Sequence, residues 1–196
     1  MNPAIEVTIQ LVVLFFVIFD PFVSLAVFTT ATQKMDRKER KKTAFLAVAV
    51  AGIISLAVLL LGQNLFTLLS TGIEDFRVAG GIILGLLGIK MVWGQSLADT
   101  DSLKKGTGRA IAAIIGTPLL TGPAAITSIM IAATDYGRLI PGLAVAIVLG
   151  ISAVMFYHAN LIQKALGKTT LQVVSTLLGL ITIAWGVKFI RMGLGI

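Results

Sequence analysis

The chain has 196 residues, of which 57% are hydrophobic and only 13% are charged, and its mean hydropathy is +0.98. Soluble domains carry about a quarter charged residues, so this composition excludes a water-soluble globular protein and indicates a membrane protein. The formal net charge is +7, but the cations lie in short runs without interleaved aromatic residues, which argues against a nucleic-acid partner. The chain has no cysteine, which excludes disulfides and thiolate metal sites.

Six windows of about 20 apolar residues, the length that crosses about 30 Å of hydrocarbon, follow one another along the chain. They predict an all-α membrane protein with six transmembrane helices, in one domain (1–196) surrounded by the lipid bilayer. The N-terminal segment has no basic region or cleavage site, so we expect it to be retained. The predicted spans are Val7–Ala31, Thr43–Leu69, Arg77–Ser96, Arg109–Ala133, Leu139–Gln163 and Thr170–Met192.

The first span is interrupted near its midpoint by Asp20-Pro21. Aspartate is a favoured helix N-cap, and proline is favoured at the first helical position, so the pair predicts a second half-helix that begins at Pro21. The amides of Phe22, Val23 and Ser24 would then point toward the bilayer centre, with the positive end of the helix dipole behind them. Such an end binds anionic groups.

The loops carry an asymmetric distribution of charge, which predicts the orientation of the chain. Eleven cations lie in the loops on one side, and four lie on the other side together with Glu6, Glu74, Asp75 and Asp135. Because cytoplasmic loops are enriched in lysine and arginine, we expect both termini outside the cytoplasm in a cell membrane. The first group comprises Lys34, Arg37, Lys38, Arg40, Lys41, Lys42, Lys104, Lys105, Arg109, Lys164 and Lys168, and the second comprises Arg77, Arg138, Lys188 and Arg191.

The fourth span is interrupted twice, at Pro118 and at Pro123. Gly122 has no side chain, so a ligand could approach its backbone closely, and Thr117 and Thr121 supply hydroxyl groups. The first amides after Pro123 should form a second helix end that faces the first one. Together these features predict a site for a small zwitterion, with substrate-binding residues Asp20, Phe22, Val23, Ser24, Thr117, Thr121, Gly122, Ala124 and Ala125.

Internal matches indicate that the two halves repeat. Gly81 and the run 88–92 match Gly179 and the run 186–190 at one constant offset, the runs 46–49 and 143–146 match, and Pro21 corresponds to Pro123. Since each half has three spans, the second half must enter the membrane from the opposite side. We therefore predict a 3+3 inverted repeat (1–98 and 105–196) with helices 1 and 4 broken near the midplane, an architecture common in secondary transporters.

Two features have alternative interpretations. The prolines could be ordinary kinks packed against neighbouring helices, although two breaks at corresponding positions favour a site. Asp20 could bind or release a coupling ion, H⁺ or Na⁺, or it could only cap a helix. No other cofactor and no metal site is predicted.

The sequence resembles the MarC/SnatA family of small prokaryotic membrane proteins over essentially its whole length. Pro21 falls on the family's proline in the first half, and Thr121-Gly122-Pro123 falls on its break in the second half. Asp20 stands where the family usually has Asn, and Val23 and Ala26 stand where Gly and a second Pro are common. The resemblance implies transport of small neutral amino acids such as glycine or alanine, driven by a proton or sodium gradient.

The sequence therefore predicts a secondary transporter that works by alternating access, with a central site between broken helices 1 and 4. An ion or small-solute channel and a non-transporting membrane assembly subunit remain as alternatives. An enzyme is not expected, because the chain has one histidine, no cysteine and no metalloprotease motif. The sequence leaves open the exact substrate, the direction of transport, the coupling ion and the oligomeric state, a homo-oligomer included.

Overall fold

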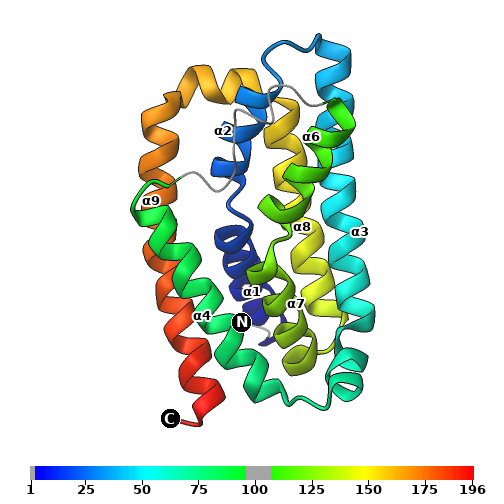
Figure 1. Cartoon of the computed structure of the whole chain (residues 1–196), viewed down its shortest axis with the longest axis vertical. Helices are drawn as coiled ribbons and strands as arrows, with labels where there is room; N and C mark the ends of the chain where they lie inside the picture. The colour runs from blue at the N-terminus through cyan, green and yellow to red at the C-terminus, as the bar shows by residue number, and fades with distance from the viewer. Residues whose placement is uncertain (1–2, 96–106) are drawn as a thin grey trace.

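The computed structural model describes residues 3–95 and 107–196, and over these residues it is all-helical. Lys104, Lys105 and the junction between the two predicted repeats lie outside the described residues. The elements in chain order are α1 (Pro3–Phe19), α2 (Pro21–Ala31), α3 (Arg37–Leu69), α4 (Ile73–Val92), α6 (Gly108–Ile114), the π-helical η1 (Ile115–Leu120), α7 (Pro123–Tyr136), α8 (Leu139–Tyr157) and α9 (Ala159–Leu194) (Figure 1).

Four stretches of the described chain are helical, long and apolar enough to cross a membrane, namely Pro3–Ala31, Arg37–Gly62, Leu139–Tyr157 and Thr169–Leu194. The other two predicted spans fall short of this description for local reasons. The 20 residues of α4 include four charged ones, and the predicted span Arg109–Ala133 is divided among α6, η1 and α7. The prediction of six spans therefore corresponds to four candidate spans, of which the first is broken at Asp20, one charged helix and one divided segment.

Two helix pairs enclose the broken segments. Helices α4 and α9 run antiparallel along each other, and α3 packs against α8 (Figure 1). Between these pairs lie α1–α2, which contacts α8 and α9, and α6–η1–α7, which contacts α3 and α4. Most of the largest fully buried side chains belong to these central segments, including Phe15, Phe19 and Phe28. The two predicted breaks are thus in the interior of the bundle.

The α4–α9 contact brings two backbones together. A Cβ added to Gly81 would lie 2.5 Å from the carbonyl oxygen of Gly186, and one added to Gly88 would lie 2.6 Å from that of Gly179. Because real Cβ atoms do not approach oxygen this closely, only glycine fits these positions in the present packing. These glycines therefore allow the two helices to pack closely.

The chain between the last two spans differs from the prediction. Helix α8 ends at Tyr157 rather than at Gln163, and α9 begins at Ala159, eleven residues before the predicted Thr170. The first turns of α9 cross the end of the bundle, drawn in orange in Figure 1, before the chain turns into the long span. The turn occurs at Gly167, whose φ of 73° is a conformation that side-chain-bearing residues rarely adopt.

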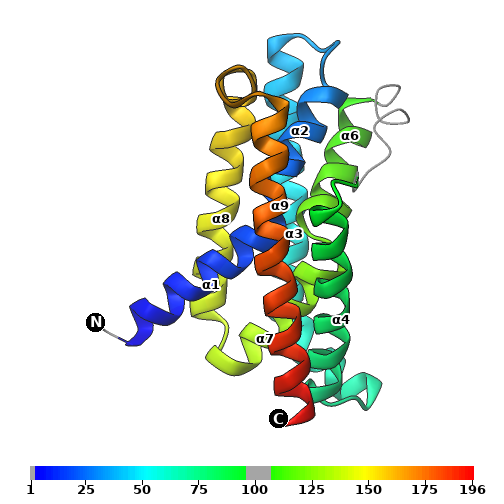
Figure 2. The same ribbon diagram turned by 90° about the vertical axis from the view of Figure 1, so that its left-hand side faces the viewer.

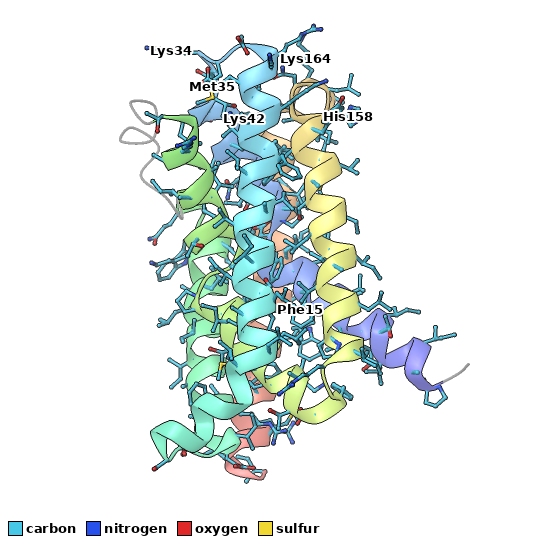
Figure 3. All side chains as sticks on the ribbon, turned by 90° about the vertical axis from the view of Figure 1, so that its right-hand side faces the viewer. Phe15, Lys34, Met35, Lys42, His158 and Lys164 are labelled. Atoms are coloured by element: carbon cyan, nitrogen blue, oxygen red, sulfur yellow. The ribbon has the colours of Figure 1, made fainter. Side chains whose placement is uncertain are left out.

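Both chain ends lie toward the same end of the bundle, and α1 leaves the bundle at an angle (Figure 2). The opposite end carries Lys34, Lys42, His158 and Lys164 (Figure 3). The described cations that the sequence assigned to one group of loops are therefore gathered away from the termini.

Candidate functional site

The first break is built by Asp20. Its backbone has φ 35° and ψ 73°, in the left-handed region that asparagine and aspartate tolerate better than other side chains. One carboxylate oxygen accepts a hydrogen bond from the Val23 amide at 3.2 Å, and the Asp20 carbonyl oxygen accepts from the Ser24 amide at 3.1 Å. The prediction that Asp20 caps a half-helix starting at Pro21 is confirmed.

The second carboxylate oxygen of Asp20 has a partner from another helix. The hydroxyl group of Ser175, on α9, donates to it at 2.8 Å. Asp20 is 3% exposed and Ser175 is fully buried, so this bond is shielded from solvent. The sequence analysis did not identify Ser175. Its only signal is that it is a hydroxyl group in an apolar span, where such groups commonly bond across helices.

The second break covers six residues. Thr117 has extended dihedral angles (φ −145°, ψ 119°), and the Thr121 amide donates to the Gly116 carbonyl oxygen at 3.1 Å, which widens the helical turn. Helix α7 then starts at Pro123, with Gly122 as its N-cap. Because Gly122 has no side chain, no side-chain oxygen caps the first amides of α7. This helix end keeps its partial positive charge.

The two breaks meet at one cavity of about 140 Å³. Five of the predicted substrate-binding residues line it, and most of its remaining wall is apolar, with Ile83 and Leu87 contributed by α4. Asp20 is the only ionisable side chain among the lining residues. The full lining is Ile18, Phe19, Asp20, Ser24, Ile83, Leu87, Leu119, Gly122, Pro123, Ala124 and Ala125.

The other four predicted residues lie outside the lining of this cavity. Phe22 packs edge-on against Phe16, with 5.8 Å between the ring centroids, and Val23 is half-buried. Thr117 is exposed. Thr121 is fully buried, and its hydroxyl group donates to the Ala51 carbonyl oxygen of α3 at 3.4 Å, so it fastens the second break to a neighbouring helix.

The electrostatics of the two helix ends differ from the expectation of two similar anion sites. At the first end, the Asp20 carboxylate already occupies the position of an anion, so a second anion there would be repelled. At the second end, Ala124 and Ala125 line the cavity, and no side chain caps the first amides of α7. One cavity thus has a negative side and a positive side. Among the described residues, no group of three or more acidic or histidine side chains that could hold a metal ion is present.

Apolar helices of membrane-spanning length, broken around a buried carboxylate and an interior cavity, define a helical integral membrane protein. A comparison of the chain with protein-family models identifies its family. The chain belongs to the MarC family of integral membrane proteins, whose model matches residues 5–195.

Relatives occur in bacteria and archaea. The chain is 32% identical over 187 residues to a UPF0056 membrane protein of Methanocaldococcus jannaschii, with 91% of each chain covered. It is 26% identical over 188 residues to the UPF0056 inner membrane protein YhgN of Escherichia coli K12, with 95% of each covered. A UPF0056 membrane protein of Buchnera aphidicola is 28% identical over 180 residues, covering 89% of this chain and 85% of the relative. No solved structure matches the chain.

Proposed function

We propose that the protein is a secondary transporter of small neutral amino acids of the glycine and alanine class. The observation that carries this proposal is the cavity of about 140 Å³ with a carboxylate on one side and an uncapped helix N-terminus on the other. A cavity of about 150 Å³ holds benzene, which has as many non-hydrogen atoms as alanine. Both the volume and the two opposite charges suit a small zwitterion.

In this proposal the ammonium group of the substrate faces Asp20 and the hydroxyl group of Ser24. Its carboxylate faces the amides of Ala124 and Ala125, because a helix N-terminus favours anions. A short side chain would rest on Ile83 and Leu87, and larger side chains would not fit. Asp20 also supplies the site at which a coupling H⁺ or Na⁺ would bind, and the proposal includes no enzymatic step and no other cofactor.

The proposal includes a 3+3 inverted repeat, residues 1–98 and 105–196, as the basis of alternating access. The packing supports it, because two of the main helix–helix contacts have an equivalent when the halves are exchanged. Helix α1 packs against α8 as α6 packs against α3, and α2 packs against α9 as α7 packs against α4. In each half the broken segment therefore contacts the last two helices of the other half.

The glycine contacts support the same symmetry at the level of residues. Gly81 corresponds to Gly179 and Gly88 to Gly186 at one offset along the chain. Under this exchange the contact between Gly81 and Gly186 becomes the contact between Gly179 and Gly88, which is the second contact observed. A two-fold axis between α4 and α9 would generate this pattern.

We further propose that the end bearing Lys34, Lys42 and Lys164 faces the cytoplasm and that both termini are extracytoplasmic, by the positive-inside rule. The name of the YhgN relative as an inner membrane protein supports a location in the cell membrane. Since both chain ends lie away from the cation-rich end (Figures 2 and 3), an even number of crossings fits this orientation.

Uptake by reconstituted vesicles tests the proposal. Vesicles containing purified protein should accumulate labelled glycine or alanine when a proton or sodium gradient is imposed, and uptake should saturate with substrate concentration. Non-saturating flux would instead identify a channel, and no flux with any small amino acid would indicate an assembly subunit. Vesicles without protein give the background.

A binding measurement on the purified protein tests the substrate site independently of transport. Calorimetric titration with alanine should give a signal that Asp20→Asn weakens, because the substitution removes the charge opposite the ammonium group. Thr117→Val, at a position outside the cavity lining, is the control and should bind as the native chain does. Equal binding by the native protein and Asp20→Asn would show that Asp20 does not bind the substrate. An unchanged pH profile of uptake in this variant would show that Asp20 does not couple transport to protons.

A further inference from the structure

A second concave site lies at the cation-rich end of the bundle, where the start of α3 meets the turn between α8 and α9. It has a volume of about 270 Å³ and is lined by Arg37, Arg40, Lys41, Phe156, Tyr157, His158, Ala159, Asn160 and Leu161. Three of these residues are permanently cationic, and no acidic side chain belongs to the lining. This site is separate from the cavity at Asp20.

Among the described residues, no acidic side chain forms a salt bridge with the cations of this site. Within the described part of the chain, Arg37, Arg40 and Lys41 form no salt bridge. The nearest acids in sequence are Asp36, which instead accepts the Glu39 amide at 2.7 Å as a helix cap, and Glu39 itself. The Nε atom of Arg40 is buried and has no hydrogen-bond partner. Within the described residues, the site therefore has cationic groups that no acidic side chain of its lining balances.

Two of the cations are held in fixed positions. Arg40 donates from its guanidinium group to the side-chain oxygen of Asn160 and lies 5.6 Å from the centroid of the Phe28 ring. Lys41 donates to the Tyr157 hydroxyl group at 2.7 Å. Such fixed side chains lose less conformational entropy on binding than free surface lysines do. Planar guanidinium groups bind phosphate oxygens in pairs.

A separate apolar groove lies deeper along the seam between α3 and α8, the two helices in front in Figure 3. The groove has a volume of about 200 Å³ and is lined by Gly52, Ser55, Leu56, Leu59, Gly142, Val145, Ala146 and Leu149. From Lys41 to Gly52, the helix rises about 16 Å, close to half of the roughly 30 Å hydrocarbon thickness of a bilayer. The same two helices thus contribute to a basic site at the cation-rich end and to an apolar groove that begins about half a bilayer thickness deeper.

We propose that this seam binds one anionic phospholipid, with its phosphate held by Arg37, Arg40 and Lys41 and one acyl chain in the groove. The basic site alone would also suit a free phosphate ion. The lipid is favoured because the groove lies along the same helix seam and is lined almost entirely by apolar side chains, which a soluble anion does not need. Cations that only set the orientation of the chain in the membrane do not need fixed side-chain positions or a neighbouring groove. Both features are expected of a lipid site.

Native mass spectrometry of the detergent-purified protein with dioleoyl-phosphatidylglycerol tests the headgroup site. We expect one retained lipid per chain, and weaker retention of zwitterionic phosphatidylcholine. Each cation near a membrane surface contributes about 1 kcal/mol toward anionic lipid, so Arg40→Gln with Lys41→Gln should weaken binding about 10- to 30-fold. The control removes the same charge from the same helix: Lys38→Gln with Lys42→Gln, at exposed positions outside the site, should retain the lipid.

A second pair of variants tests the groove. This test remains valid even where the charge variants fail to fold. Ala146→Phe fills the groove and should weaken retention of the lipid, whereas Ala57→Phe, at an exposed position of α3 outside the groove, should not. Equal loss in both charge pairs would show non-specific attraction and overturn the proposal. It would also be overturned if inorganic phosphate displaced the lipid and Ala146→Phe had no effect, since the site would then hold a free anion.

Discussion

Asp20 combines three structural features in one residue. Its backbone adopts a left-handed conformation, one oxygen caps α2, and the other accepts from Ser175 at the edge of the cavity. Few residue types can satisfy the first two conditions, since the left-handed region and the N-cap position both favour Asn and Asp. The negative charge is the property that aspartate adds to these, and it is what gives the cavity its negative side.

Substitutions at Asp20 should separate the backbone role from the charge. Asp20→Asn keeps the cap and the tolerated conformation, whereas Asp20→Ala loses both. The Asn variant should therefore be more stable than the Ala variant by about 1–3 kcal/mol, combining the cap and the left-handed conformation. Reversible denaturation in detergent micelles measures this difference. Equal stabilities would show that neither the cap nor the conformation matters at this position.

Ser175→Ala should destabilise the fold by about 1–3 kcal/mol, because it leaves a buried carboxylate oxygen without its donor. Ser152→Ala is the matched control. Ser152 is also fully buried, but its hydroxyl group donates only to the Val148 carbonyl oxygen of its own helix, at 2.9 Å. The same denaturation measurement should show a clearly larger loss for the first variant, and equal losses would contradict a specific role for the bond to Asp20.

The residues of the two breaks could be predicted because they follow local rules. Asp20 and Pro21 fit the cap and first-turn preferences of a helix, and Gly122 with Pro123 fits them again. Ser175 could not be found in this way. Its partner is 155 residues away in the chain, and nothing local distinguishes it from other hydroxyl groups in the same span. Its identification needed the packing of α9 against α2.

At the scale of helices, α4 and α9 pack with their backbones in contact, with Gly81 against Gly186 and Gly88 against Gly179. The spacing of these glycines was visible in the sequence, but the partners were not. The proposed repeat pairs Gly81 with Gly179, whereas the structure places Gly81 in contact with Gly186, because the two helices are antiparallel.

Alanine substitutions should distinguish the contacting glycines from their neighbour. Gly81→Ala and Gly88→Ala should each destabilise the protein by about 1–3 kcal/mol, because the new methyl group meets a carbonyl oxygen of α9. Gly85→Ala is the control in the same helix, since an added Cβ there meets nothing within 4 Å. It should be neutral or stabilising by up to about 1 kcal/mol from its better helix propensity. Thermal unfolding in detergent compares the three variants, and a Gly85→Ala loss as large as the others would contradict this packing.

The ends of the last two helices show where the sequence is least informative. The hydropathy of residues 158–169 does not reveal that α8 stops at Tyr157 and that a short helical stretch follows. Gly167 was the available signal, but glycine also occurs inside straight helices of this chain, such as at Gly85 and Gly150. The positive φ that distinguishes Gly167 from them is a property of the folded chain.

At the scale of the whole molecule, the charges and the chain ends divide the bundle into two different ends. Lys34, Lys42 and Lys164 lie at one end and both termini lie toward the other (Figures 2 and 3). Hydropathy predicted the approximate positions of four apolar spans, whereas the other two of the six predicted spans fall on a charged helix and on a divided segment. Which segments enclose which could not, because it depends on contacts between halves that are far apart in sequence.

Because the chain has no cysteine, single cysteines can report its orientation without background. Lys164→Cys and Leu194→Cys place a thiol at exposed positions near opposite ends of the bundle. In spheroplasts, a membrane-impermeant maleimide should label Leu194→Cys at once and Lys164→Cys only after lysis. The reverse pattern would place the termini in the cytoplasm and would invert the proposed orientation.

The glycine contacts between α4 and α9 restrict how the molecule can change shape. Two backbones in direct contact have no rotamers that can rearrange, so a new relative position of these helices would require the whole contact to be broken at once. The pair should therefore stay together as a fixed frame while the other elements move. In the proposed transport cycle, the cavity would then open to the opposite side of the membrane by movement of α1–α2 and α6–η1–α7 about the residues at their two breaks.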